Sequence, residues 1–279
     1  MNHPAELAIN QYLEDATSGK STMSEETITQ IGTDVMDAMR RQFGGGKGRD
    51  EFRLRMSNIG KPTCQLWFAK NKPEEALPKP TTFVMNMLLG DIVEAAFKGI
   101  IKEAGYPYED KDNFVTLELG GATIKGSYDI VVDGAMDDVK SASDWSYRNK
   151  FESYDTLQKS DPFGYVGQLA GYAKASGKKV GGWWVVNKAN GNIKYVPADG
   201  LVLDEQIAKL EKTVETVNDN KFERCFAPVP ETFRGKPSGN VILNDNCKFC
   251  DFRFSCFDIE ELPSKVSQAR TLPIVAYIK

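Results

Sequence analysis

The sequence GSYDIVVDGAMDDVKS, residues 126–141, contains two strand-like segments separated by an Asp-Gly turn signal. Successive side chains of a strand point to opposite faces, which predicts Tyr128 and Ile130 together on one apolar face. Asp129 stands between them and is therefore expected on the opposite, less apolar face. A turn of this kind suits an antiparallel hairpin, so we expect the two strands to pair.

Asp138 and Lys140 stand two residues apart in the second strand, so we expect both on one face of it. Pairing of the strands would bring Asp129, Asp138 and Lys140 into one cleft. Phosphodiester hydrolysis needs a cation that polarises the phosphate, and Mg²⁺ or Mn²⁺ prefers carboxylate oxygens with retained water. An ammonium group nearby can steady the negative charge of the transition state. Taken alone, an Asp-x-Lys pair is more commonly a solvated strand edge.

A helix is predicted over residues 81–104, and on it Glu94 shares a face with Met87, Phe97 and Ile101. A carboxylate among apolar neighbours is costly to bury unpaired, so we expect a cation or a hydrogen-bond partner beside it. Glu94 is therefore a candidate third metal ligand. The other acidic residues of the region are expected in solvent or in turns: Asp91, Asp133 and Asp137.

The rest of the chain alternates between helical and strand-like patterns, with no internal repeat. This order predicts one α/β core with a mixed sheet. The segment after residue 222 is rich in Pro, Gly and Cys and has little periodicity. The expected helices are 24–43, 81–104, 162–176 and 203–222, and the expected strands are 114–119, 123–133, 136–141, 180–187 and 193–197.

Composition narrows the function further. The chain has 279 residues and a net charge of −4, which argues against a bulk electrostatic binder of nucleic acid. Its only histidine is His3, expected in a mobile terminus, which argues against histidine-based hydrolases and zinc proteases. No segment has the apolar length of a signal peptide or a membrane helix, so we expect a cytoplasmic protein that does not bind membranes.

Three of the five cysteines form the compact pattern Cys247-x2-Cys250-x5-Cys256. A fourth thiolate would complete a Cys₄ site for zinc or for an iron–sulfur cluster. The candidates for it are Cys64 and Cys225, and spacing decides neither between them nor between the metals. An odd number of cysteines without a secretion signal fits a reduced compartment better than a disulfide framework.

Four spaced motifs follow one another: Gly90-x3-Glu94, Gly126-x2-Asp129, Asp138-x-Lys140 and Gln168-x3-Tyr172. Their order resembles the RecB-like branch of the PD-(D/E)XK nucleases, from about residue 61 to the end. The resemblance implies a restriction-endonuclease-like core, a central mixed β-sheet flanked by helices. It assigns metal binding to Asp129 and Asp138, assistance in catalysis to Lys140, and a place along the DNA path to Gln168 and Tyr172.

One position departs from the usual pattern, because many members carry histidine where this chain has Glu94. Related exonucleases use glutamate there, which keeps Glu94 as a ligand but leaves the metal preference open. Members with a 4Fe-4S cluster, the AddB-type and CRISPR-associated exonucleases, pair one upstream cysteine with a C-terminal C-x2-C-x5-C. The resemblance therefore implies a cluster of structural role held by Cys64, Cys247, Cys250 and Cys256, with Cys225 as a packed thiol.

These expectations describe a stand-alone, divalent-metal-dependent exonuclease acting on single-stranded DNA or processed duplex ends. The resemblance also implies a phage, recombination or CRISPR-type setting with partner proteins to match. Alternatives are a catalytically silent iron–sulfur module that binds DNA ends, and a zinc-stabilised interaction protein. The expected organisation is an N-terminal helical segment over residues 1–46, a nuclease core over 47–224, and a C-terminal cluster segment over 225–279 that docks with Cys64.

Overall fold

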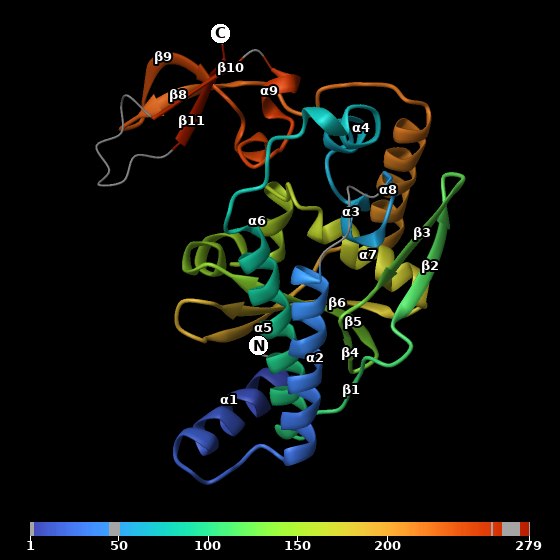
Figure 1. The fold of residues 1–279 in the computed structure, drawn as a ribbon, viewed down its shortest axis with the longest axis vertical. Helices are drawn as coiled ribbons and strands as arrows, with labels where there is room; N and C mark the ends of the chain where they lie inside the picture. The colour runs from blue at the N-terminus through green and yellow to red at the C-terminus, as the bar shows by residue number, and fades with distance from the viewer. Residues whose placement is uncertain (1–2, 45–50, 258, 264–273, 279) are drawn as a thin grey trace.

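The computed structural model describes residues 3–44, 51–257, 259–263 and 274–278. At its centre lies a five-stranded sheet in the order β1-β4-β5-β6-β7 (Figure 1). β5 and β6 are parallel and the other neighbours are antiparallel, so the sheet is mixed, as predicted. The strands are β1 (Tyr108–Glu109), β4 (Ile130–Val132), β5 (Ala135–Ala142), β6 (Lys179–Asn187) and β7 (Ile193–Pro197).

Helices cover both faces of this sheet, which confirms the α/β prediction. One apolar layer joins the sheet to α1 (Pro4–Thr17) and α5 (Phe83–Glu103), and α2 (Glu25–Phe43) lies against α5. The opposite layer joins the sheet to α3 (Met56–Ile59), α7 (Tyr165–Ser176) and α8 (Leu203–Asn218). Two short elements, η2 (Ser146–Lys150) and α6 (Tyr154–Lys159), connect β5 to α7.

The strand predicted over residues 123–133 is interrupted. β2 (Phe114–Leu119) and β3 (Ala122–Ser127) form a separate hairpin, and the chain then crosses to β4 in the central sheet. Across this break Tyr128 joins the apolar layer of α7, whereas Ile130 joins the layer of α5. The expectation that they share a face is therefore wrong, because strand alternation holds only within one continuous strand.

His3, the first described residue, packs against the rest of the protein. The His3 side chain caps α1, because its Nδ1 accepts a hydrogen bond from the Ala5 backbone N–H at 3.1 Å. The imidazole ring also packs on the sheet, with its centroid 5.2 Å from that of Trp184 and 4.6 Å from that of Tyr195. The prediction of a mobile His3 is wrong, because α1 brings it onto the aromatic side chains of β6 and β7.

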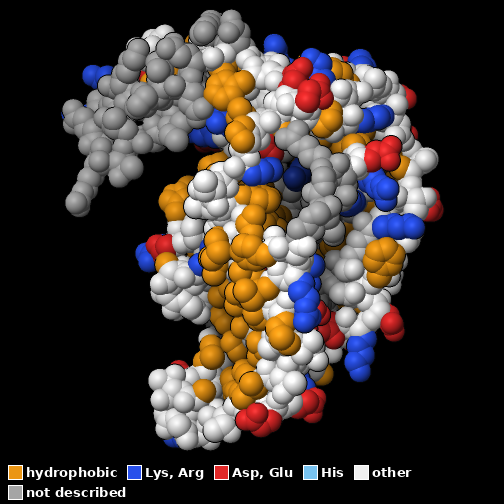
Figure 2. Space-filling model, viewed as in Figure 1, with side chains coloured by type: hydrophobic (Ala, Val, Ile, Leu, Met, Phe, Trp, Pro, Cys, Tyr) orange, Lys and Arg blue, Asp and Glu red, His pale blue; other side chains and the backbone are white. Residues whose placement is uncertain are grey.

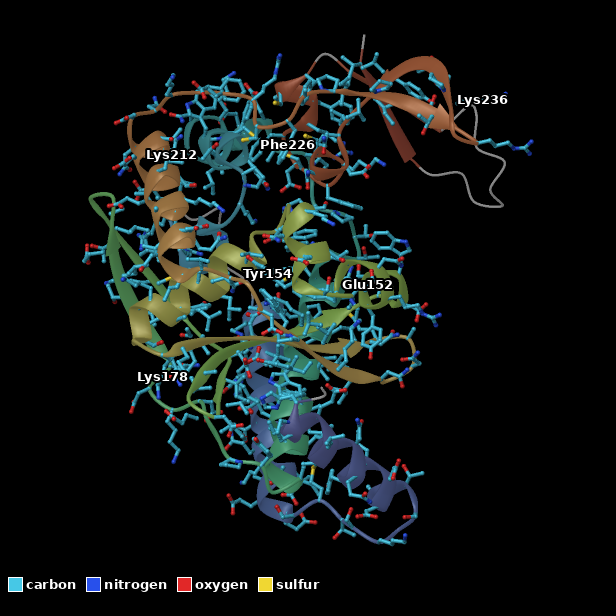
Figure 3. The ribbon with its side chains drawn as sticks, turned by 180° about the vertical axis from the view of Figure 1, so that it is seen from behind. Glu152, Tyr154, Lys178, Lys212, Phe226 and Lys236 are labelled. Atoms are coloured by element: carbon cyan, nitrogen blue, oxygen red, sulfur yellow. The ribbon has the colours of Figure 1, made fainter. Side chains whose placement is uncertain are left out.

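The C-terminal segment contains a second sheet that the sequence pattern did not predict. Its strand order is β10-β11-β9-β8. An apolar cluster joins this segment to α4, with Phe68 stacked on Phe252 at 5.4 Å and Phe226 packed alongside (Figure 3). The elements are α4 (Thr63–Asn71), η1 (Pro73–Glu75), β8 (Val229–Phe233), β9 (Lys236–Ile242), η3 (Asp245–Cys247), α9 (Arg253–Cys256), β10 (Ile259–Pro263) and β11 (Ile274–Ile278).

The proposed boundary between residues 46 and 47 lies outside the described residues. On the face of the molecule that Figure 2 shows, hydrophobic side chains gather in a band over α2 and α5. Exposed members of these helices include Met36, Met39, Met85 and Met87. Among the helices in the described ranges, none has the length and apolar content needed to cross a bilayer.

Candidate active site

Asp129 and Asp138 lie side by side where β4 begins. The antiparallel register pairs Ile130 with Asp137, which places Asp129 next to Asp138. Asp129 is further held by the neighbouring strand, because its Oδ2 accepts a hydrogen bond from the Val139 backbone N–H at 2.8 Å. The predicted hairpin is confirmed, and it brings the first two candidate ligands together.

Lys140 completes this group from the same strand as Asp138. Its Nζ lies 2.5 Å from Asp138 Oδ2, and the side chains of Lys140 and Asp138 are 17% and 3% exposed. The Asp-x-Lys pair is thus not a solvated strand edge. Apart from this ion pair, neither Asp138 carboxylate oxygen has a hydrogen-bond donor among the described residues.

The charges of this group are strongly coupled. Burial and the adjacent Asp138 carboxylate raise the pKa of Asp129 to about 6. Burial also raises the pKa of Asp138, although Lys140 opposes the shift. Burial lowers the pKa of Lys140, but Asp138 and Asp129 raise it by more, so the lysine stays charged. Burial thus favours the neutral form of both carboxyl groups, and the charge of Lys140 favours their ionised form.

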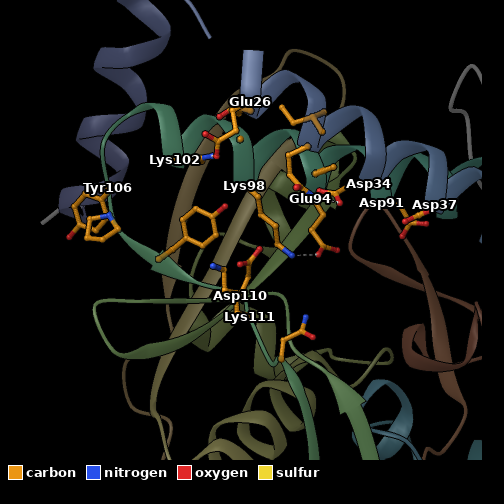
Figure 4. Close-up of a pocket in the computed structure, with 18 of the residues that line it drawn as sticks. Glu26, Asp34, Asp37, Asp91, Glu94, Lys98, Lys102, Tyr106, Asp110 and Lys111 are labelled. Carbon is orange, nitrogen blue, oxygen red and sulfur yellow. Dashed lines mark hydrogen bonds and ion pairs between the residues drawn. The ribbon is translucent and has the colours of Figure 1, made fainter. Parts of the chain in front are cut away.

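Glu94 approaches the same group from α5. Its Oε1 lies 2.8 Å from Lys98 Nζ one helical turn later, which supplies the partner expected for it (Figure 4). Burial and the charge of Asp129 raise the pKa of Glu94. One turn before Glu94, α5 passes over β5, where a Cβ added at Gly90 would lie at an ordinary contact distance of 3.8 Å from Ser141 Oγ.

A cavity of about 970 Å³ opens beside Glu94, between α2, α5 and the segment around β1 (Figure 4). Acidic side chains outnumber basic ones along its wall, which disfavours a phosphate backbone there. The acidic residues lining it are Glu26, Asp34, Asp37, Asp91, Glu94 and Asp110, and the basic ones are Arg41, Lys98, Lys102 and Lys111.

Two of the three acidic residues expected in solvent or turns fit that expectation. Asp133 occupies the β4–β5 turn with φ 52°, where it accepts a hydrogen bond from the Tyr106 hydroxyl. Asp91 lies at the cavity wall, where its Oδ2 accepts a hydrogen bond from Gln42 Nε2 at 3.1 Å.

Asp137 contradicts the expectation, because its side chain is buried between β5, β6 and β7. It accepts hydrogen bonds from Gly182 N at 2.7 Å, Trp184 Nε1 at 2.9 Å and the Tyr195 hydroxyl at 2.9 Å. Burial raises its pKa to about 7 despite these bonds. The adjacent Asp137 and Asp138 are both buried because helices cover both faces of the sheet, which the strand pattern alone does not reveal.

Tyr172 and Gln168 lie on α7, behind the acidic group. The Tyr172 ring is 4% exposed and packs 6.4 Å from the ring of Tyr128, so an ordinary helix surface is ruled out for it. Gly126 leaves room for this tyrosine, since a Cβ added there would lie 2.9 Å from its hydroxyl. Burial raises the pKa of Tyr172 to about 12, and a hydrogen bond with Gln168 opposes the shift.

A groove of about 590 Å³ lies on the side of the β2–β3 hairpin, beside Gly126 and Ser127. No acidic residue of the described segments lines it, in contrast to the cavity beside Glu94. Such a lining suits a phosphate backbone. Its basic residues are Arg53, Arg55, Lys70 and Lys125.

The cysteines gather where α4 meets the C-terminal segment. Cys225 Sγ accepts a hydrogen bond from the Cys64 backbone N–H at 3.1 Å. Cys225 is exposed, which contradicts the expectation that it is a packed thiol. Burial and then the charges of Cys250 and Cys256 raise the pKa of Cys247 to about 12. The structure thus brings the upstream cysteine and the C-terminal trio into one region, with Cys225 beside them.

In neither candidate metal site do three ligand side chains of the described residues converge. In the described ranges, no three His, Cys, Asp or Glu side chains lie close enough to hold a metal ion. The two aspartates still fit a hard divalent cation as ligands. Neither buried carboxylate oxygen of Asp138 accepts a hydrogen bond from the described residues, and Asp129 adds a second carboxylate. A cation between them would favour the ionised form of both carboxyl groups, against the burial that raises both pKa values.

Comparison with known proteins gives little further information. No protein-family model matches the chain, and no curated protein matches it. A solved structure described as "Crystal structure of SSO0001" is similar over 81% of this chain and 94% of that chain, with a TM-score of 0.45 and 13% sequence identity. A likeness of this degree supports no statement about function or about individual residues.

Proposed function

We propose that this chain is a divalent-metal-dependent DNA exonuclease with the restriction-endonuclease-like core of the RecB-like PD-(D/E)XK nucleases. The observation that carries the proposal is the buried group of Asp129, Asp138 and Lys140 at the β4–β5 hairpin. Burying two carboxylates and a lysine costs several kcal/mol unless they are compensated. A cation bound between the two carboxylates would compensate this cost.

Asp129 and Asp138 would hold Mg²⁺ or Mn²⁺, with Glu94 as a third oxygen donor. The cation would supply Lewis-acid polarisation of the scissile phosphate. Lys140 would stay charged, held by Asp138, and would stabilise negative charge on the phosphate oxygens. Tyr172 would support the group from behind, because its phenol packs against Gly126, and Gln168 lies one turn earlier on α7.

The basic groove beside Gly126 and Ser127 supports DNA as the substrate. Its cations would bind the phosphate backbone without reading sequence. The net charge of −4 is consistent with this assignment, since the positive charge is local to the groove. We also propose that the protein cuts at the ends of single-stranded DNA or of processed duplex DNA.

The cysteine region supports a 4Fe-4S cluster held by Cys64, Cys247, Cys250 and Cys256. Such a cluster would join α4 to the C-terminal segment, which already share an apolar contact through Phe68. We assign it a structural role, because ligands far apart in sequence hold the two ends of the core together when the metal is bound.

The test compares wild type with Lys140→Ala on end-labelled single-stranded and duplex DNA, with and without Mn²⁺. Loss of the ammonium should lower cleavage by about 100-fold or more. Lys178→Ala is the matched control, since Lys178 is also ion-paired, to Glu109 at 2.8 Å, but on the surface. Cleavage by Lys140→Ala at the wild-type rate would refute the assignment.

A catalytically silent module that binds DNA ends is the second candidate. The observation that favours it is the ion pair between Glu94 and Lys98, because it gives the candidate third metal ligand a partner within the protein. The same assay separates the two: binding of labelled ends without any Mn²⁺-dependent cleavage by wild type would support the silent module.

A further inference from the structure

Three aromatic rings are stacked beside the acidic group, in the segment that runs from the end of β5 to the first residue of α7. The ring of Phe163 stacks on that of Tyr165, with centroids 5.6 Å apart and planes 20° apart. The ring of Tyr165 stacks in turn on that of Phe151, at 5.9 Å and 24°. We call Phe163, Tyr165 and Phe151 the aromatic ladder. Its inner end is buried, with Phe151 3% exposed, and its outer end is open, with Phe163 42% exposed.

Two lysines lie against the ladder and connect it to the candidate active site. Lys150 Nζ is 4.5 Å from the centroid of the Phe163 ring and 4.8 Å from that of Tyr165. Lys140 Nζ is 5.0 Å from the centroid of the Tyr165 ring. One tyrosine thus separates the exposed ring of Phe163 from the ammonium group that is ion-paired with Asp138.

The charge of Lys150 remains available to a ligand. It forms no ion pair with any residue the structure describes. The negative charge of Asp161 acts on Lys150 and favours its charged form. The carboxylate oxygens of Asp161 also accept hydrogen bonds at the start of α7, from Gly164 N at 3.0 Å and Val166 N at 2.8 Å. Lys150 is therefore a cation placed over two rings of the ladder, next to the exposed Phe163.

We propose that the aromatic ladder binds an unpaired nucleobase, which stacks on Phe163 while Lys150 contacts the adjoining phosphate. This inference rests on the proposed function and specifies its substrate as single-stranded DNA. An exposed ring with a neighbouring cation is the arrangement by which proteins hold single strands without reading their sequence. A base inside a duplex is already stacked on both sides, whereas an unpaired base has a free face for Phe163.

An exposed phenylalanine can also be an ordinary surface residue, and Phe83 on α5 supplies that comparison. Phe83 is 38% exposed and has Lys79 Nζ 5.1 Å from its ring centroid, which matches Phe163 in type, exposure and lysine contact. It differs in belonging to no ring stack among the described residues. It also begins the helix of Glu94, eleven residues earlier, which corresponds to about 16 Å along the axis.

The experiment measures binding of a fluorescent single-stranded oligonucleotide to full-length protein in EDTA, which prevents cleavage. Phe163→Ala should weaken binding by about 5- to 150-fold, the equivalent of ~1–3 kcal/mol. Phe163→Trp should retain binding, and Phe83→Ala should match wild type. Equal affinity of Phe163→Ala and wild type, with unchanged thermal melting, would overturn the inference.

An oligonucleotide of abasic sites, which keeps the phosphates and lacks the bases, isolates the stacking contact. The difference between wild type and Phe163→Ala should disappear on that strand, whereas Lys150→Gln should weaken binding to both strands. An equal loss on both strands would show that Phe163 acts through structure rather than through a base. Failure of Lys140→Ala to lose cleavage would refute the nuclease proposal instead, so the two failures are distinguishable.

Discussion

Lys140 Nζ lies 2.5 Å from Asp138 Oδ2. Both side chains project from the same face of β5, and they are 17% and 3% exposed. Each charge thus has its nearest compensation two residues away on one strand. Breaking such a pair from one side leaves an uncompensated buried charge, which typically costs about 3–5 kcal/mol. The relationship therefore predicts stability effects as well as catalytic ones.

Lys140→Ala should lower the free energy of unfolding of the metal-free protein by about 3–5 kcal/mol. Asp138 would then be left with buried oxygens and no donor among the described residues. Urea denaturation in EDTA measures this loss. The double variant Asp138→Asn/Lys140→Ala should recover part of it, because neither charge remains. A double variant less stable than both single variants would contradict the charge-pair account.

Asp129→Asn should abolish the stabilisation that Mn²⁺ gives to wild type. The amide can still accept the hydrogen bond from Val139 N, but it removes a negative charge beside Asp138. The metal-free variant should therefore melt no lower than wild type. Melting curves over a Mn²⁺ titration provide the measurement, since a bound ion raises the melting temperature by mass action.

Asp133→Asn is the matched control for that titration. It makes the same substitution in the same hairpin, at a turn with φ 52° that asparagine adopts readily. Asp133→Asn should keep the full response to Mn²⁺. A response retained by Asp129→Asn, or lost by both variants, would remove Asp129 from the proposed ligand set.

Asp137→Ala should destabilise the fold strongly, although Asp137 touches no proposed ligand of the metal. The substitution would leave Gly182 N, Trp184 Nε1 and the Tyr195 hydroxyl without their acceptor. Each buried unsatisfied donor costs about 1–3 kcal/mol. Tyr195→Phe removes one donor together with its hydroxyl and should cost only about 1 kcal/mol. Chemical denaturation measures the loss in free energy of unfolding of each variant. A larger loss for Tyr195→Phe than for Asp137→Ala would contradict this account.

Asp137 also marks the limit of what sequence patterns predicted. The helix of Glu94, the β4–β5 hairpin and the Asp-x-Lys strand depend on local periodicity and turn chemistry, and all are present. The burial of Asp137 depends instead on β6 and β7, which are more than forty residues away. The register of β5 on β6 also shifts between Met136 and Asp138, which no local pattern encodes.

Long-range pairing explains the missed C-terminal sheet as well. β8 and β9 form a hairpin with a proline in each strand and a glycine in β9, and β11 joins β9 by pairing Tyr277 with Ile242. Such strands lack the alternation that marks a half-buried sheet. The aromatic ladder was missed for a related reason, since Phe151 follows η2 whereas Tyr165 begins α7, and no local periodicity brings these two rings together.

The choice between Cys64 and Cys225 as the fourth cluster ligand can be made by iron content. The structure holds these cysteines in contact, since Cys64 N donates to Cys225 Sγ at 3.1 Å. We expect Cys64→Ser to lose iron and the absorbance near 400 nm, and Cys225→Ser to retain both. Anaerobic purification with metal analysis provides the measurement. Loss of iron in Cys225→Ser alone would reverse the assignment, and colourless wild type carrying zinc would exclude iron.

His3 should make the docking of α1 depend on pH. Burial lowers its pKa below 6.5, against the opposing charges of Asp133 and Glu6. The neutral imidazole accepts the hydrogen bond from Ala5 N, and a protonated ring cannot. Because the folded state binds fewer protons than the unfolded state, stability is fully present above pH 6.5 and is lost as the pH falls through the folded pKa.

The measurement is an NMR titration of the single histidine, compared with urea denaturation at pH 7.5 and 5.5. His3→Asn serves as the control, since asparagine caps a helix well and does not titrate. Wild type should lose more stability than His3→Asn between the two pH values. A titration midpoint above 6.5 would mean that the attraction of Asp133 and Glu6 outweighs burial, and stability should then rise on acidification instead.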